Sequence, residues 1–218
     1  KSLKLKKFGN VKNIQNKSIE LCLLLSVPAS LGLILASEEI INALFGYGSF
    51  TNSDVTMTAK ALKYFGYGIP AFALIKVLSN FYFARDNTKT PFYLSLFSVV
   101  LNIAISLLLF KKIGFIIIPI ATSISTWLAV ILYFILLGKS KFLFFENLPL
   151  YNFFKIIFCT FIMSFVLYYG LSFFEDKLAY DNIYKSIYLV FMIGLVAMIY
   201  LINCYLFGLL KFKNYRAF

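Results

Sequence analysis

Residues 113–138 read IGFIIIPIATSISTWLAVILYFILLG, a run of 26 residues without Lys, Arg, Asp or Glu. A helix needs about 20 mostly apolar residues to cross the hydrocarbon core of a bilayer. Five further windows of similar length show the same pattern: residues 21–37, 64–84, 90–110, 156–174 and 186–210. Together they contain only one charged residue, Lys76. The sequence therefore predicts an all-α polytopic membrane protein with six transmembrane helices.

The composition of the whole chain agrees with this fold class. Its 218 residues are 61% hydrophobic and 14% charged, whereas a soluble domain carries about 25% charged residues. Disordered chains are poor in apolar residues, so disorder is excluded too. A transmembrane β-barrel would show alternating segments of about 10 residues, and continuous apolar runs such as 116–118 argue against it. Because the chain opens on Lys1 rather than Met, we expect it to be a piece of a longer protein.

The net charge of +12 predicts an orientation in the membrane. If six helices span the bilayer, fourteen of the Lys and Arg residues lie on the side of the N-terminus and six lie on the other side. Basic residues concentrate in cytoplasmic loops, so both termini are expected in the cytoplasm. This account of the basic excess predicts no nucleic-acid partner.

The order of polar and apolar stretches predicts four regions. They are a basic cytoplasmic segment (1–17), a four-helix unit (18–138), an interfacial linker (139–155) and a C-terminal helix pair with a cytoplasmic tail (156–218). The first segment is either a loop or the end of an amphipathic helix. Apolar spacing over residues 38–45 predicts a short helix in the outer interface, and the next helix is expected to begin near Asp54.

Several helix-breaking residues lie inside the predicted spans. Pro28, Gly66, Gly68, Pro70 and Pro119 are expected at kinks, because Pro lacks the N–H that continues a helix. The three that fall within residues 66–70 soften or break one span. Transporters use discontinuous helices where they bind or move, and an ordinary packing kink is the alternative.

Lys76 is the most informative charge because it lies within a span. It precedes Arg85 by nine residues, which places it roughly 13 Å from the cytoplasmic end of a helix. Charges inside a membrane usually face a bundle interior or an aqueous cavity. Asn80 lies one turn further on the same face. We expect Lys76, Asn80 and Arg85 to line a cavity or substrate path; the alternative for Lys76 is snorkelling or helix pairing.

Two neighbouring spans carry polar side chains that face each other. The stripe on residues 90–110 includes Asn102 and Ser106, and the following span carries Thr122. Small hydroxyl and amide residues commonly join membrane helices. A weak cation site formed by the same oxygens is the alternative interpretation. The apolar, aromatic-rich span over 156–174 either faces lipid or forms a groove for a lipid chain.

Residues suited to catalysis or to metal binding are scarce. The chain has no His, and Cys22, Cys159 and Cys204 lie in or beside spans without metal-ligand spacing. The acids of residues 175–181 share one predicted loop with no His beside them. We therefore predict no catalytic residue, no metal and no cofactor. A membrane-embedded polyprenyl-phosphate transferase remains the alternative from the enzyme class.

Residues 26–139 resemble the MurJ (MviN) lipid II flippase family, which belongs to the multidrug/oligosaccharidyl-lipid/polysaccharide exporter superfamily. The resemblance rests on several runs taken together: VPA over 27–29, LFGYGSFT over 44–51 with Asp54, TAKAL over 58–62, GIPAF over 68–72, and KVL over 76–78 followed by FYFARDNTKTP over 81–91. The last run is similar to the family's signature with Asn87 inserted. The combination is specific, whereas each run alone is weak.

The resemblance implies a function and a set of partners. It implies that this chain holds the last six of fourteen helices of a bacterial inner-membrane flippase. Such a protein moves an undecaprenyl-pyrophosphate-linked peptidoglycan precursor to the outer leaflet by alternating access. The partners would then be this precursor, membrane lipids and the N-terminal half of the same protein. In some relatives an Asn, an acid and a Thr hold sodium; Asn102 and Thr122 match, but Ser106 replaces the acid. A flippase for another polyprenyl-linked oligosaccharide is the alternative within the class.

Overall fold

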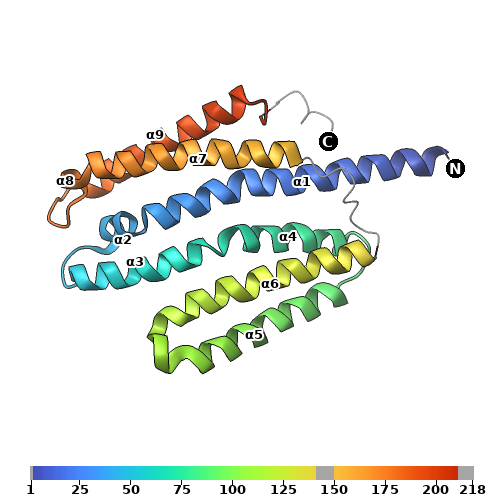
Figure 1. Ribbon diagram of the computed structural model, residues 1–218, viewed down its shortest axis with the longest axis horizontal. Coiled ribbons are helices and arrows are strands. Elements are labelled where there is room, and N and C mark those ends of the chain that lie inside the picture. The colour runs from blue at the N-terminus through green and yellow to red at the C-terminus, as the bar shows by residue number, and fades with distance from the viewer. Residues whose placement is uncertain (1, 141–149, 211–218) are drawn as a thin grey trace. The chain divides into compact units, whose positions relative to one another are not determined.

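The computed structural model describes residues 2–140 and 150–210, and all secondary structure in those ranges is helical (Figure 1). Most of the predicted interfacial linker and of the basic tail therefore lies outside the described residues. The helices are α1 (Ser2–Leu35), α2 (Ser37–Phe45), α3 (Asn52–Gly66), α4 (Ile69–Phe83), α5 (Lys89–Ile113), the 3₁₀ turn η1 (Gly114–Ile116), α6 (Ile117–Lys139), α7 (Leu150–Phe173), α8 (Glu175–Leu178) and α9 (Lys185–Leu206).

Five helical segments of the described chain are long and apolar enough to cross a membrane. They cover residues 13–35, 52–83, 89–139, 151–173 and 185–206. The all-helical membrane class predicted from the sequence is confirmed. The expected number was six, and it stays a prediction; the segment 89–139 contains two helices, α5 and α6. Figure 1 shows these two as an antiparallel hairpin, which turns at Gly114 with a positive φ of 75°.

The N-terminal basic residues continue into the first span. From the sequence, residues 1–17 could form either a loop or the end of a helix. In the structure they belong to a helix, because α1 begins at Ser2 and runs unbroken to Leu35. Pro28 lies inside this helix. Its ring leaves one carbonyl of the preceding turn without a backbone partner, which membrane helices tolerate when neighbouring groups compensate.

The short helix predicted over residues 38–45 is confirmed as α2, which ends at Gly46. Thr51 and Asp54 then begin α3 by bonding to each other reciprocally. The Asp54 carboxylate accepts from the Thr51 N–H at 2.9 Å, and the Thr51 hydroxyl accepts from the Asp54 N–H at 3.3 Å. This is a capping box, which satisfies two backbone donors at a helix start. It places the start of α3 close to the expected position.

The described chain forms two compact units. Unit 1 comprises the described residues of Lys1–Ser26 and Tyr67–Leu150, and unit 2 comprises those of Val27–Gly66 and Tyr151–Phe218. Two of the boundaries therefore fall next to Pro28 and within the Gly66–Gly68 break. These two units do not correspond to the four regions expected from the sequence, and that division stays a prediction.

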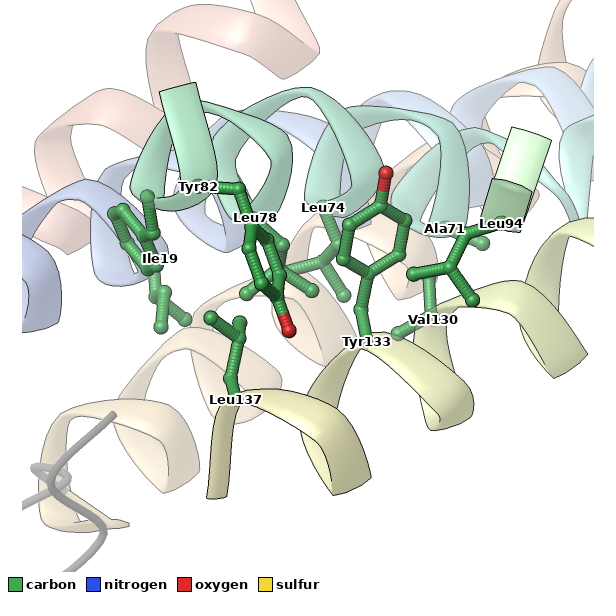
Figure 2. Packing of buried hydrophobic residues seen from close by; sticks show 10 residues of the cluster. Ile19, Ala71, Leu74, Leu78, Tyr82, Leu94, Val130, Tyr133 and Leu137 are labelled. Carbon is green, nitrogen blue, oxygen red and sulfur yellow. The ribbon is translucent and has the colours of Figure 1, made fainter. Parts of the chain in front are cut away.

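The core of unit 1 lies mainly between α4 and α6, as Figure 2 shows. Tyr82 extends from α4 toward α6, and Tyr133 extends from α6 toward α4. Their ring centroids are 6.0 Å apart. Leu78 and Leu137 are fully buried beside them. This packing fixes the face of α4 that points away from the core, and that face carries Lys76.

Unit 2 has two packed regions. Ile41 from α2 packs with Val55 and Ala59 from α3. Figure 1 shows α7 and α9 running alongside each other. At one end of this pair the rings of Phe158 and Phe207 meet edge to face with centroids 5.5 Å apart.

Candidate functional site

Lys76 and Asn80 line one pocket of unit 1, with a volume of about 830 Å³. The pocket lies between the outward face of α4 and the first turns of α5. The described residues that line it include two lysines, Lys76 and Lys89, and no carboxylate. Aromatic rings, among them Phe92, form its apolar wall. The pocket therefore combines positive charge with apolar surface, and this suits an anionic group attached to a lipid.

Arg85 lies in the turn that follows α4 and is not among the residues lining this pocket. Its guanidinium donates to the Phe81 carbonyl at 2.5 Å. The same turn carries Asp86 at a positive φ of 56°. Asn87, the insertion noted in the sequence, accepts a hydrogen bond from the Thr90 N–H at 3.1 Å and so supports the start of α5. The structure thus brings together two of the three residues expected to share a path.

Asn102, Ser106 and Thr122 come together between α5 and α6. The Asn102 amide donates to the Thr122 hydroxyl at 2.7 Å, and the Ser106 hydroxyl donates to the Asn102 carbonyl oxygen at 3.4 Å. The Thr122 hydroxyl in turn donates to the Ile118 carbonyl at 2.7 Å. Each polar group therefore bonds within the hairpin itself.

The segment with Gly66, Gly68 and Pro70 interrupts a helix. α3 ends at Gly66, and α4 begins at Ile69 with Pro70 in its first turn, where a missing N–H costs nothing. A break at membrane depth frees backbone carbonyls, which must find other donors. In unit 2 the Ser30 hydroxyl donates to the Gly66 carbonyl at 2.7 Å. In unit 1 the Trp127 indole donates to the Tyr67 carbonyl at 2.9 Å.

Sequence reasoning did not single out Ser30 or Trp127. Trp127 is the one Trp of the sequence, but its count gave no indication of the hydrogen bond that its indole makes. Ser30 had no signal either among the many serines of the spans. Pro119, by contrast, lies in the first turn of α6, where Pro is well tolerated.

We expect Gly66→Ala to destabilise the chain by about 1–3 kcal/mol, the usual cost of overpacking. A Cβ at Gly66 would stand 2.8 Å from Cγ1 of Ile34 and would push α1 away from α3. The free energy of unfolding in detergent micelles measures this effect. Gly32→Ala is the matched control, because a Cβ there meets nothing within 4 Å. Equal stability of the two variants would contradict the close approach at Gly66.

A second pocket, of about 530 Å³, lies in unit 2 beside the first turns of α7. Aromatic residues such as Phe154, Phe158 and Phe207 line most of it. Lys155 donates to the carbonyl of Phe207, just past the end of α9, at 2.8 Å. A cation is favourable at a helix C-terminus. The pocket is apolar, as expected for a surface that accepts hydrocarbon.

Two acids at the start of α2 have different surroundings. Glu38 is exposed, and its carboxylate accepts from the Thr56 hydroxyl at 3.3 Å. Burial raises the pKa of the Glu39 carboxyl, and the negative charge of Glu38 adds to this shift. A raised pKa means that Glu39 favours folding when protonated and loses this contribution as the pH rises through its pKa.

The chain combines apolar helices, an interrupted helix and a basic pocket. These features place it in the class of multi-pass α-helical membrane proteins with a discontinuous span, of the kind that transporters use. The chain belongs to the MurJ family. The family model described as "Lipid II flippase MurJ" matches residues 1–189. Membership makes this a multi-pass protein of the bacterial inner membrane and confirms the family predicted from the sequence.

Individual relatives agree with this assignment. The probable lipid II flippase MurJ of Rickettsia prowazekii is 42% identical over 54% of this chain and 23% of its own length. The Haemophilus influenzae relative of the same description is 28% identical over 92% of this chain and 39% of its own length. A solved structure described as lipid II flippase MurJ in an inward closed conformation matches with a TM-score of 0.74 at 30% identity. That match covers 93% of this chain and 40% of the other. The chain thus spans well under half the length of these relatives.

Proposed function

We propose that this chain is the C-terminal part of a lipid II flippase, with six transmembrane helices and both termini in the cytoplasm. The observation that carries the proposal is the match to a solved lipid II flippase over 93% of the chain. The N-terminal part of the same protein supplies the rest of the transport cavity. The role is transport by alternating access and not catalysis.

The pocket beside Lys76 is the part of the substrate path that we assign to this chain. Its lysines attract the anionic headgroup linkage of lipid II, and its aromatic wall accommodates the adjoining lipid. Charges within spans usually face such cavities. Asn80 adds hydrogen-bonding capacity on the same face. Arg85 orders the adjoining turn through its bond to Phe81.

Bending during transport takes place at Pro28 and at the α3–α4 break. Two of the three boundaries between the compact units support this, because they lie next to Pro28 and between Gly66 and Tyr67; the third lies between Leu150 and Tyr151. Hinges are usually a few residues at element ends that absorb the backbone change. Pro119 has no such role, since it lies in the first turn of α6.

The remaining polar and apolar sites have supporting roles. The Asn102–Thr122 hydrogen bond joins α5 to α6, and we favour this helix-pairing role over a cation site. The aromatic pocket beside Phe158 and Phe207 accepts the lipid tail. Its walls come from α7 and the end of α9, the helix pair that follows the four-helix unit.

Depletion of the resident flippase in a bacterial host tests this function. Expression of the full-length protein that contains this chain should restore growth and the arrival of lipid II at the outer leaflet. The chain by itself should insert without restoring either, because part of the cavity is missing. A full-length protein that inserts but moves no lipid II would contradict the proposal. Accumulation of another polyprenyl-linked oligosaccharide in cells lacking it would indicate the alternative substrate.

A further inference from the structure

Lys185, the first residue of α9, is a buried cation that the proposed transport does not use. Its side chain is 1% exposed. Burying a charge is costly unless the charge is paired and hydrogen-bonded. The ammonium has three donors, and they meet the Asn42 side-chain oxygen at 3.0 Å, the Gly46 carbonyl at 2.6 Å and the Tyr180 carbonyl at 2.7 Å. All three acceptors are amide oxygens.

Aromatic rings complete the surroundings of this ammonium. Nζ lies 4.2 Å from the ring centroid of Tyr47 and 4.7 Å from that of Tyr180. Ring faces attract cations at such distances. We call these three oxygens and two rings the ammonium cage. Its chemistry is that of a binding site for a primary ammonium group, and the lysine of α9 occupies it.

The cage is built on the C-terminal end of α2. Asn42 lies in the last turns of this helix, and Gly46 is its C-cap. Carbonyl groups at a helix C-terminus carry partial negative charge, so this end favours a cation. Lys185 is separated from Asn42 by 143 residues and from Gly46 by 139. The contact therefore joins two distant parts of unit 2.

A side chain at position 46 would collide both with the cage and with the backbone of α2. The φ of Gly46, −70°, is open to any residue. A Cβ at this position would stand 2.3 Å from Asn42 Oδ1, 2.6 Å from the Asn42 backbone oxygen and 3.1 Å from Lys185 Nζ. Because Gly46 has no side chain, the Lys185 ammonium and the Asn42 amide oxygen can occupy the space beside its Cα.

Neighbouring hydrogen bonds attach the same two segments. The Asn42 amide donates to the Leu178 carbonyl at 2.8 Å, and the Ser186 hydroxyl donates to the Ala43 carbonyl at 2.7 Å. The Tyr180 hydroxyl donates to the Phe50 carbonyl at 2.5 Å. These bonds orient the cage but carry no net charge. The ammonium is the one charged group among them.

We infer that Lys185 is the positioning residue that docks the α8–α9 connection onto the α2–α3 turn, with its ammonium held in a cage formed by Asn42, Gly46, Tyr47 and Tyr180. The docking is independent of the transported substrate. Its role is to hold the start of α9 on the end of α2 within unit 2.

Protection of a buried cysteine tests this docking. In the full chain, purified in detergent micelles with Cys22, Cys159 and Cys204 replaced by Ala, Ala43→Cys places a thiol beside Ser186 at a position that is 4% exposed. A water-soluble maleimide should label this thiol slowly. Lys185→Met should raise the labelling rate about tenfold or more, because the charged hydrogen bonds that keep the segments together are lost. Lys177→Met, which removes an exposed lysine of the adjoining α8, should leave the rate unchanged.

Two further measurements separate the cage from a general loss of structure. Gly46→Ala retains every charge and should also raise the rate, whereas Gly32→Ala should not. Lys185→Ala should be partly rescued by propylammonium, which replaces the missing atoms, and not by propanol. Labelling at the parental rate in Lys185→Met, or an equal increase in Lys177→Met, would overturn the inference. Equal effects of propylammonium and propanol would overturn it as well.

Discussion

Lys76→Met in the full-length protein is expected to slow lipid II translocation about tenfold or more while the protein still inserts into the membrane. Met keeps the apolar stem of Lys76 and removes the charge from the pocket between α4 and α5. A hydrogen bond to a charged group is worth about 1.5–3 kcal/mol, and about 1.4 kcal/mol corresponds to a factor of ten. The arrival of lipid II at the outer leaflet of flippase-depleted cells measures the effect.

Two variants accompany this measurement. Lys76→Arg keeps a positive charge at the pocket and should retain more translocation than Lys76→Met. Lys112→Met removes an exposed lysine from the far end of α5 and should have no effect. Normal translocation by Lys76→Met, at equal protein level in the membrane, would remove Lys76 from the mechanism. It would leave the family assignment intact.

Tyr133→Ala is expected to lower the free energy of unfolding by about 3–5 kcal/mol, the usual cost of truncating a buried aromatic residue. Tyr133 is 1% exposed and packs against Tyr82 in the core of unit 1 (Figure 2). Its hydroxyl also bonds to Ser79 at 2.8 Å. Unfolding of the purified chain in mixed micelles, followed by loss of helical signal, measures the change.

Tyr133→Phe separates packing from hydrogen bonding. It removes only the bond to Ser79, and hydrogen bonds between membrane helices are worth about 0.6 kcal/mol on average. Tyr205→Ala is the exposed control, since Tyr205 is 65% exposed on α9. A loss in Tyr133→Ala no larger than in Tyr205→Ala would show that the α4–α6 core is not what holds unit 1 together.

The lengths of the windows without charged residues predicted most of the fold from the sequence. The window over 113–138 corresponds closely to α6, and the hairpin with α5 follows from the short connection at Gly114. The apolar pattern over 38–45 predicted α2. The sequence could not predict where α1 begins. A basic segment that continues a helix has the same composition as a basic cytoplasmic loop.

The candidate site was less accessible to sequence reasoning. Lys76 attracted attention because it lies within a span, and the structure places it in an exposed position on a pocket wall. Lys185 entered the sequence reasoning only as one of the charges that flank the spans, yet its side chain is buried. Its local sequence resembles that of any residue at a helix start. Asn42 and Gly46 of the cage that surrounds it lie 143 and 139 positions away, and only Tyr180 is a near neighbour, five residues before it. No local pattern contains the distant partners.

The hydrogen bond from Trp127 to Tyr67 gives the chain an intrinsic optical reporter. The indole is the only one in the sequence, and its N–H ends on a carbonyl released by the helix break. Indole emission responds to hydrogen bonding and to local polarity. Steady-state fluorescence of this chain, without any attached dye, can therefore follow opening or closing of the break.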